Sequence, residues 1–529
     1  MNIHRRSFTT RLTTRRHCRG RLPLLTLIVT LQAVGCGSTD TESTEPLPTS
    51  SARLYEGAVL IPGNDSEPID DSAFLVDDGR IMAVGRRGEL GLPPGAGRVN
   101  LSGKTVMPML VSYHGHVGYQ DGLSYDAANY TRATLIDHLN RYAYYGVGAI
   151  LSLGTDAGDV VFEIRADQDR DIPGRARLLT AGRGLAAPDA GPGAEALRGS
   201  AYGVTTEEEA LDAVRELALS GVDVVKIWVD DRNGNVEKLD PDLYRAIIDE
   251  AHARDLPVIA HVYYAADAAD LVEAGVDGFA HLVRDEEMSR PLVEAIASNN
   301  ILVMPNLGIS ERGTYREPPD WLDDPLLLES VPPDVITRAK ASFERRTSER
   351  ADQARTSYAM MQRSLASLNA AEVPIVLGAD SGVQDHFFGY TELRELELMV
   401  AAGLTPQETI QAATSRPAAL LGLDDIGQLT AGKRATFIVF DENPLDDIAH
   451  IRSIADVFMN GERLPASHAN FYIANGLVLV PTFNDPMDRV ALETVAALFP
   501  GRSTVGIHAL DLLWGLGTLH CMTHQQPAI

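Results

Sequence analysis

The sequence predicts an α/β protein in which an eight-stranded β/α (TIM-like) barrel is flanked by a small β-sandwich. From Val106 to about Thr414, short apolar runs alternate with helical patterns, which is typical of parallel β/α units. Eight such runs lie within about 300 residues, as a closed barrel requires. On either side, at 53–106 and at Gly432–Arg463, the chain changes to short alternating runs broken by turn residues.

The eight apolar runs predict the barrel strands, and helical patterns such as Glu207–Leu219 and Pro241–Arg254 lie between them. An open doubly wound sheet is the alternative, but no glycine-rich phosphate loop follows an early strand. The predicted strands are Thr105–Val111, Ala149–Leu153, Arg177–Ala181, Val222–Val229, Pro257–Val262, Gly278–His281, Ile301–Pro305 and Ile375–Gly378.

The flanking β-sandwich is expected to be composite, with strands from both sides of the barrel. Turn sequences such as Gly63-Asn64-Asp65 and Asp78-Gly79 divide the first part, and Thr436–Asp441 and Ala455–Met459 supply strands of the second. We therefore divide this part of the chain into a sandwich of 53–106 and 415–465 and a barrel of 107–414.

The N-terminal 35 residues contain seven Arg and no acidic residue, and an apolar run from Leu22 to Val34 follows the basic part. That run is too short to span a bilayer, and the pattern predicts a secretory signal at 1–35. Ala33-Val34-Gly35-Cys36 resembles a bacterial lipobox, which implies cleavage before Cys36 and lipidation of its thiol. The alternatives are an uncleaved anchor or a mis-assigned start.

The location that follows is the cell envelope. We expect a lipoprotein anchored at the outer membrane and facing the periplasm or the exterior, because Gly37 stands where Asp would signal inner-membrane retention. Residues 36–52 are rich in Ser, Thr, Glu and Pro and are expected to form a flexible tether.

The composition excludes one class of partner. Asp plus Glu number 73 against 46 Lys plus Arg, a net charge of −27, which argues against nucleic-acid binding. The three cysteines are Cys18, Cys36 and Cys521; after cleavage and lipidation only Cys521 stays free, so no disulfide framework is expected. The membrane is expected as a partner through the lipid anchor only, and a homo-oligomer is left open.

Potential metal ligands lie where five of the predicted strands end: His114 and His116, then Lys226 within the fourth strand, His261, His281 and Asp380. The carboxyl ends of barrel strands face one end of the barrel, and residues two apart on a strand point to the same side. A single histidine at such a place is as often an ordinary packed residue. Four histidines and an aspartate at one end indicate a metal site.

Lys226 stands in the apolar run VDVVKIWV, where a charged amine is costly to bury. Desolvation lowers the pKa of a lysine, and the neutral amine can react with carbon dioxide to form a carbamate. Such a carbamate can bridge two cations about 3.5–4 Å apart. The alternative is a Lys226 that pairs with Asp230 or Asp231.

Several motifs resemble the amidohydrolase superfamily, in its imidazolonepropionase- and prolidase-like branch, over about 53–465. They are Gly103–Pro108 leading to His114-Gly115-His116, the stretch 260–282, GADSG at 378–382, and the stretch 415–448. The resemblance implies two divalent ions, usually zinc. It places His114, His116 and Asp380 on one ion and His261 and His281 on the other, with N6-carboxylated Lys226 as the bridge.

The activity implied by this resemblance is metal-dependent hydrolysis of an amide, peptide or cyclic amide C–N bond by a metal-activated hydroxide. Asp380 and Lys226 are the expected catalytic residues, with Asp380 taking the proton. We expect a small-molecule or dipeptide-like substrate, and Tyr263, Tyr264 and Arg284 are placed to hold a carboxylate.

The family pattern is broken at Met109, which replaces a small residue, and at Ser112, which replaces a carboxylate able to orient the histidine pair. Thr436 stands where relatives usually carry Asp. These departures leave open a non-catalytic, metal-bound lipoprotein.

The C-terminal segment resembles a different family. Residues 470–528 are similar to the C-terminal end of a bacterial agmatine deiminase, which implies an α/β fragment at 466–529 with Cys521 at the nucleophile's place. Deimination also needs a histidine and carboxylates, and no upstream stretch resembles that family. Cys521 is therefore interpreted as a vestigial nucleophile, with guanidine hydrolysis of the agmatine or peptidylarginine deiminase type as the alternative. Gene fusion and frameshift would both explain the segment.

Overall fold

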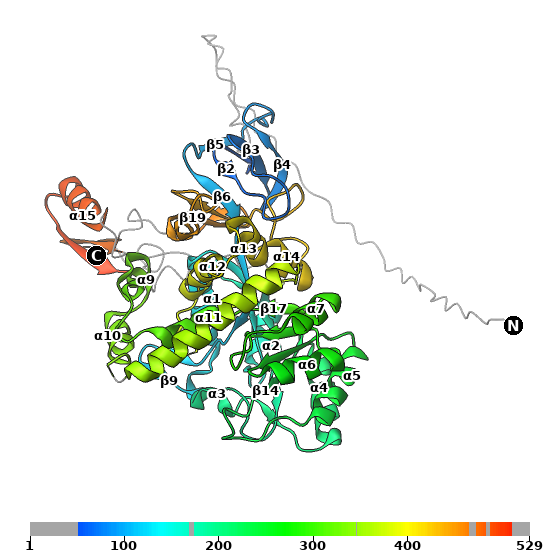
Figure 1. Cartoon of the computed structure of the whole chain (residues 1–529). Coiled ribbons are helices and arrows are strands. Elements are labelled where there is room, and N and C mark those ends of the chain that lie inside the picture. Colours follow the sequence, from blue (N-terminus) through cyan, green and yellow to red (C-terminus); the bar gives the residue numbers. More distant parts are fainter. Residues whose placement is uncertain are drawn as a thin grey trace, which may run out of the picture. The chain divides into compact units, whose positions relative to one another are not determined.

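The computed structural model describes residues 51–168, 174–344, 346–383, 385–464, 472–474, 476–482 and 487–509. These residues form a mixed α/β fold (Figure 1). The predicted signal peptide, the lipidation site Cys36 and the cysteine Cys521 lie outside the described residues. Within them, no helix combines the length and the apolar composition needed to cross a membrane.

Two β-sheets contain the strands that precede β7. One of them also contains β18, β19 and β20, which lie more than 300 residues later in the sequence. Strand β6 pairs with β18, so that Thr105 lies opposite Phe440, and the blue and orange strands of Figure 1 meet there. The first sheet has the order β4 (Arg80–Arg86), β3 (Ser72–Asp77), β1 (Arg53–Glu56), β5 (Gly97–Asn100). The second has the order β2 (Val59–Leu60), β6 (Thr105–Pro108), β18 (Phe437–Phe440), β19 (Ile454–Met459), β20 (Glu462–Arg463).

A single aromatic cluster fills the space between these two sheets. Tyr55 stacks on Phe74 in the first sheet, and Phe437 stacks on Phe458 in the second. Tyr55 and Phe437 meet edge to face, with ring centroids 5.4 Å apart. All four rings are buried, so both sheets contribute to one core and stabilise each other by apolar burial.

The middle of the chain consists of parallel strands and helices. One ladder has the order β11–β10–β7 and another runs through β14, β15, β16 and β17 in sequence order, after the short strands β13 and β12. The strands are β7 (Leu110–Gly115), β10 (Val147–Ser152), β11 (Arg177–Thr180), β12 (Leu185–Ala186), β13 (Tyr202–Gly203), β14 (Val225–Val229), β15 (Val258–Val262), β16 (Gly278–Ala280) and β17 (Leu302–Met304). A separate two-stranded hairpin consists of β8 (Gln120–Asp121) and β9 (Ser124–Tyr125).

Between these two parallel ladders there is no regular strand pairing, and individual backbone hydrogen bonds and bridges connect them instead. The amide of Asp223 donates to Thr180, which links β11 to the approach to β14. On the other side, Val303 pairs with Ile375 and Gly115 pairs with Ser381, both in parallel. The segment from Ile375 to Ser381 therefore connects β17 to β7.

Two of the predicted strands differ from what the structure has. The first predicted strand divides at Met109, because the chain leaves the ladder with β18 there and begins a second ladder with β10. The last predicted strand, Ile375–Gly378, does not form a regular strand. Ile375 pairs with Val303 of β17, whereas the carbonyl of Leu377 accepts from the amide of Tyr113 in β7. The segment therefore forms no continuous ladder with either neighbour.

Several helices begin at recognisable capping residues. In α4 (Glu207–Ser220) the Thr206 hydroxyl and the Glu209 carboxylate form a capping box, and in α5 (Pro241–His252) Asp240 caps a helix that starts with Pro. The other long helices are α1 (Arg132–Tyr144), α2 (Val160–Gln168), α6 (Ala265–Ala274), α7 (Arg290–Ser298), α10 (Pro333–Ala341), α11 (Ser348–Ala370), α12 (Tyr390–Ala401) and α13 (Pro406–Ala413). Shorter helices are α3 (Glu195–Arg198), α8 (Leu307–Glu311), α9 (Pro325–Ser330) and α14 (Ser415–Leu420).

The C-terminal segment has a sheet of its own. Strand β22 (Leu477–Thr482) pairs antiparallel with β21 (Tyr472–Ala474) and parallel with β23 (Ser503–His508), and α15 (Met487–Leu498) connects the last two. Its apolar cluster centres on Val478, Val480 and Val495. Leu498 is 66% exposed, so this small unit leaves a large apolar side chain in solvent.

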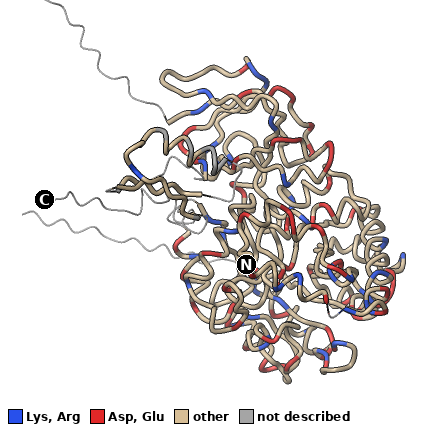
Figure 2. Tube along the Cα trace, turned by 90° about the vertical axis from the view of Figure 1, so that its left-hand side faces the viewer, with Lys and Arg blue, Asp and Glu red and all other residues tan. Residues whose placement is uncertain are grey.

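Acidic and basic residues are both spread along the described chain (Figure 2) and do not cluster in one segment. In Figure 2 the acidic residues are spread along the described chain and basic residues alternate with them, without a segment that is basic throughout. Many of these charges are paired across elements. Asp425, for example, forms ion pairs with Arg177 of β11 and with Arg434.

Candidate metal centre

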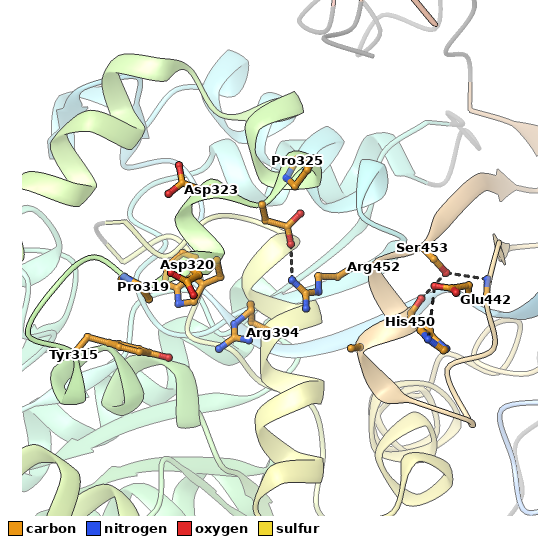
Figure 3. Close-up of a pocket in the computed structure, with 13 residues that line it drawn as sticks. Tyr315, Pro319, Asp320, Asp323, Pro325, Arg394, Glu442, His450, Arg452 and Ser453 are labelled. Atoms are coloured by element: carbon orange, nitrogen blue, oxygen red, sulfur yellow. Dashed lines mark hydrogen bonds and ion pairs between the residues drawn. The ribbon is translucent and has the colours of Figure 1, made fainter. Parts of the chain in front are cut away.

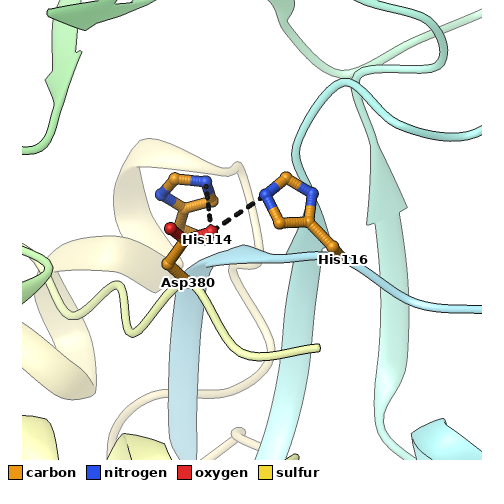
Figure 4. A group of neighbouring side chains, drawn as sticks. All are labelled: His114, His116 and Asp380. Carbon is orange, nitrogen blue, oxygen red and sulfur yellow. Dashed lines mark ion pairs between the residues drawn. The ribbon is translucent and has the colours of Figure 1, made fainter. Parts of the chain in front are cut away.

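Three side chains from two distant segments converge on one point in the buried interior (Figure 4). His114 lies within β7, His116 directly follows it, and Asp380 comes from the segment that pairs with β7. Nε2 of His116 is 2.9 Å and Nε2 of His114 is 3.4 Å from Oδ1 of Asp380. One ligand atom from each lies within 4.8 Å of the other two, so the three could hold a metal ion.

The other nitrogen of each histidine has its own partner. Nδ1 of His114 lies 3.2 Å from Oδ1 of Asn306, and Nδ1 of His116 lies 3.0 Å from the hydroxyl of Thr155. A proton on Nδ1 leaves Nε2 with the lone pair that a metal needs. These two contacts therefore orient both rings toward Asp380 in the form that binds a cation.

The backbone is strained where these segments turn. His281, Asn306 and Asp380 all have left-handed backbone torsions, with φ of 75°, 47° and 57°. A bulky residue rarely adopts positive φ, and clusters of such residues mark sites where the surrounding structure imposes a geometry. Each of the three follows a strand or, for Asp380, the strand-like segment, so these three strained residues lie at the carboxyl end of the parallel strands.

The second pair of predicted histidines lies beside the first. Nε2 of His281 is 3.9 Å from Oδ2 of Asp380, and its ring centroid is 4.6 Å from that of His261. His261 instead directs Nε2 to Asp230, at 3.0 Å. Nδ1 of His281 is buried without a hydrogen-bond partner. Three histidines thus adjoin the Asp380 carboxylate, and His261 lies beside His281 but is turned toward Asp230.

Lys226 of β14 is fully buried, and its Nζ has no hydrogen-bond partner. The alternative in which it pairs with Asp230 or Asp231 is wrong: Asp230 contacts His261, and Asp231 accepts from the Tyr264 hydroxyl. Burial lowers the pKa of Lys226 to about 7, although the Asp380 carboxylate opposes the shift.

Two glycines make room for the Lys226 side chain. A methyl group at Gly154 would lie 2.5 Å from Cγ of Lys226, and one at Gly184 would lie 2.1 Å from the Trp228 ring and 3.1 Å from the same Cγ. Any side chain at either position would therefore displace the lysine stem. The amine is held in an apolar, tightly filled channel.

Burial favours the neutral form of His114, His261 and His281, whereas Asp380 stays charged. Burial lowers the pKa of His114 and of His281 well below the usual range and that of His261 to about 4. Burial opposes the ionisation of Asp380, yet the neighbouring His114 and His116 hold its pKa well below the usual range. Neutral imidazoles beside a carboxylate are the donor set that a divalent cation prefers.

The structure accommodates both departures near the histidine pair. Met109 packs over Gly148, whose absent side chain leaves room for it, and its amide donates to the carbonyl of Thr436 at 3.3 Å. The Ser112 hydroxyl donates to the buried carboxylate of Glu392 at 3.2 Å. A carboxylate is therefore present beside Ser112, supplied from helix α12.

Several residues at this centre were not identified from the sequence. Asn306 directly follows the seventh predicted strand, and a polar residue at the carboxyl end of a strand could have been predicted to face the centre. Thr155 and Glu392 carry no such signal, because the loop and the helix that hold them meet the centre only through the fold. Of the three loop residues expected to hold a carboxylate, Tyr264 is bonded to Asp231, whereas Nε of Arg284 is buried without a partner.

An open cleft of about 750 Å³ lies elsewhere, and none of the candidate ligands lines it (Figure 3). Its arginines are paired already: Arg452 with Asp324 and Glu397, and Arg394 with Glu311 and Glu397. A buried, strained cluster of ligand atoms is a better indication of chemistry than an open surface hollow. The cleft is therefore not the candidate site.

Residues 206–464 match the model of the Amidohydrolase family. This is an amidohydrolase domain. The match contains Lys226, His261, His281 and Asp380, while His114 and His116 precede it.

Several solved structures are similar to this chain over most of its length, including the stretch that matches the Amidohydrolase family. A protein provisionally named a prolidase from Bifidobacterium longum has a TM-score of 0.62 and 26% identity, covering 80% of this chain and 98% of its own. A Xaa-Pro dipeptidase with bound methionine (TM-score 0.61, 21% identity, 78% and 99% covered) and the A. niger ochratoxinase (0.61, 22%, 78% and 96%) show the same fold.

The C-terminal segment matches a second family. Residues 434–527 match the model of Porphyromonas-type peptidyl-arginine deiminase. A protein provisionally named agmatine deiminase from Latilactobacillus sakei is 50% identical over 68 residues, and one from Listeria monocytogenes is 46% identical over 67. These stretches are 13% of this chain and 19% and 18% of the relatives, so the chain spans about a fifth of their length.

Proposed function

We propose that this protein is a metal-dependent amidohydrolase that cleaves an amide, peptide or cyclic amide C–N bond. The observation that carries the proposal is the convergence of His114 and His116 with Asp380, a residue of the stretch that matches the Amidohydrolase family, in a buried, strained site. We infer that β7, β10, β11, β14–β17 and the segment Ile375–Ser381 close an eight-stranded barrel. The two sheets that share the Tyr55 cluster would be its flanking sandwich.

The residues present fit two divalent ions. His114, His116 and Asp380 offer one set of donors, and His261 and His281 offer a second beside it. The unpartnered Nζ of Lys226 fits a carbamate, since burial lowers the pKa of the amine to about 7 and so leaves a reactive neutral fraction near neutral pH. Nitrogen and carboxylate donors favour zinc. Bound there, two such ions would supply a water-derived nucleophile near neutral pH and polarise the substrate carbonyl.

The role we assign to Asp380 is that of proton acceptor and donor. Its Oδ1 faces His114 and His116, and its Oδ2 faces His281. As a carboxylate beside the bound ions, it would accept a proton from the attacking water and pass it to the leaving nitrogen. Thr155 and Asn306 keep the imidazoles fixed while the proton moves.

The substrate class we propose is a small amide or dipeptide with a free carboxylate. Arg284 follows His281 by three residues, and its amide donates to the carbonyl of Tyr263. Its buried Nε has no partner, and Asp380 is among the charges that act on it. An arginine of this kind can bind a carboxylate beside the scissile bond.

The test is a metal analysis followed by hydrolysis assays on dipeptides and N-acyl amino acids, each beside its C-terminal amide. We expect about two divalent ions per chain. We also expect hydrolysis of the free acids, with a KM that rises at least tenfold in Arg284→Met. A preparation that contains two ions per chain but hydrolyses none of these substrates would favour the non-catalytic lipoprotein.

We also propose that the mature chain begins at a lipidated Cys36 and is anchored at the outer membrane. Supporting this is the basic and apolar leader that precedes Ala33-Val34-Gly35-Cys36. Cys36→Ala should leave the precursor unprocessed and abolish its extraction into detergent as a lipid-modified protein. Unchanged processing and membrane association in Cys36→Ala would contradict the lipoprotein assignment.

A second candidate function is guanidine hydrolysis through Cys521, favoured by the identity of the C-terminal segment to agmatine deiminases. We propose instead that the segment is a remnant, because the described part of it has a core of three fully buried apolar residues. Release of ammonia from agmatine by the wild-type protein, lost in Cys521→Ala, would reverse this conclusion.

A further inference from the structure

Two glutamates of α12 are buried beneath the candidate metal centre. Glu392 and Glu395 are both fully buried, and their spacing of three places them on the same face of the helix. Neither has an ion-pair partner within the part of the chain that the structure describes. A buried carboxyl group is costly unless hydrogen bonds satisfy its oxygens, so the partners of the two side chains bear on their role.

Glu392 connects the two segments that bear the first three ligands. Its Oε1 accepts from the Ser112 hydroxyl at 3.2 Å and from the Ser381 hydroxyl at 2.6 Å. Ser112 precedes His114 by two residues in β7, and Ser381 directly follows Asp380. One oxygen atom therefore fixes the spacing between the strand of the histidines and the turn of the aspartate. Tyr142 completes the network, with its hydroxyl 2.6 Å from that of Ser381.

Glu395 acts on a third segment in the same way. Its two oxygens accept from the amides of Leu307 and Gly308, at 2.6 and 2.8 Å. These amides directly follow Asn306, whose Oδ1 accepts from the backbone amide of His281 at 3.0 Å and contacts Nδ1 of His114. Asn306 has a left-handed backbone, which the bond to Glu395 helps to hold.

We propose that Glu392 and Glu395 are positioning residues of the metal centre, which act through Ser112, Ser381 and Asn306 on the ligand geometry. The inference rests on the proposed function, because it takes His114, His116 and Asp380 to be ligands of a bound cation. Such supporting contacts are worth about 10–100-fold in metal affinity. A purely structural role would change the stability of the metal-free protein and leave metal binding as it is.

The experiment uses the full chain, stripped of metal and titrated with Co²⁺ against a chromophoric chelator. Co²⁺ also reports coordination geometry through its visible absorption bands. The variants are Glu392→Gln and Glu395→Gln, with Glu397→Gln as the matched control. Glu397 lies on the same helix but pairs with Arg394 and Arg452, away from the centre.

We expect Glu392→Gln and Glu395→Gln to weaken Co²⁺ binding about 10–100-fold and to shift the absorption bands. Glu397→Gln should bind Co²⁺ within twofold of the wild type, whatever its thermal stability. Dissociation constants and spectra equal to those of the wild type in both site variants, together with a lower Tm, would overturn the proposal. That result would leave the proposed function intact.

A milder variant covers the case in which a glutamate variant does not fold. Ser112→Ala removes one donor to Glu392 and little volume, and it should weaken Co²⁺ binding several-fold; unchanged binding would count against the proposal. A wild-type chain that binds no Co²⁺ at all would instead sink the metal-dependent function, and this inference with it.

Discussion

Two of the apolar cores in the described chain differ in how far apart in the sequence their residues lie. The core around β7 and β10 brings together side chains from Ile61 to Met459. The core of the C-terminal sheet is built on Val478, Val480 and Val495, which lie close together in sequence. The first packs around β7, the strand that bears the candidate metal ligand His114. A site of that kind is held by packing from every side, which a short segment cannot supply.

The sharpest test of this contrast is to remove one group from each region. Asp380→Ala should lower kcat/KM by a factor on the order of 10³ or more and reduce the metal content, because both the ligand and the proton acceptor are lost. His261→Ala should lose metal as well. Cys521→Ala should leave kcat/KM and metal content unchanged. Equal losses in Asp380→Ala and Cys521→Ala would show that the C-terminal segment takes part in the reaction.

Lys226 supplies a second test within the large core. Lys226→Ala should lower activity about 100-fold, and short carboxylates such as acetate or propionate should restore part of it by entering the space that Gly154 and Gly184 leave. Lys226→Met fills that space and should not respond to carboxylates. Crystallography of the metal-loaded protein should show a carbamate on Nζ. A free ammonium bonded to Asp230 there would contradict the role we assign to Lys226.

The ion pairs of Asp425 test how the large core depends on pH. Burial opposes its ionisation, but Arg177 and Arg434 outweigh it and lower the pKa of Asp425 to about 2. A carboxyl whose pKa is depressed on folding contributes stability above its unfolded pKa and loses it as pH falls through the folded value. About 2 kcal/mol should therefore disappear between roughly pH 4 and 2.

Urea denaturation of wild type and Asp425→Asn at a series of pH values measures that contribution. The difference in unfolding free energy between the two should be largest above pH 4 and should shrink toward pH 2. A constant difference across this range would mean that Asp425 stabilises the fold without its charge.

The smallest effect is expected from removing the C-terminal segment altogether. Truncation after Ala466 should preserve metal content and hydrolysis within about twofold, because β20 ends at Arg463 and completes its sheet without later residues. Solubility should improve, since side chains such as Leu498 are exposed. Loss of hydrolysis in a truncated chain with an unchanged far-UV spectrum would make the segment part of the active site.

The periodicity of the sequence predicted the parallel strands well, because strands such as Val225–Val229 are buried on both faces and therefore apolar throughout. The same reasoning wrongly predicted β6 and β7 as one strand, because the hydropathy of the sequence does not change at Met109, where the pairing partner changes. The strand-end rule identified His114, His116 and Asp380, which the structure brings together. Glu392 and Glu395 could not be predicted, because an isolated glutamate in a helix has the pattern of a solvated face until its neighbours are known.

The pairing of Thr105 with Phe440 has a consequence for synthesis of the chain. During translation β6 emerges early, and the strand that covers its edge emerges only after the whole catalytic region. Until then β6 has an unpaired edge, which is the part of a β protein most prone to bind other chains. The second sheet can therefore form only after Phe437–Phe440 has been synthesised. A chain released from the ribosome before Phe437 would keep the edge of β6 unpaired and would be prone to aggregate.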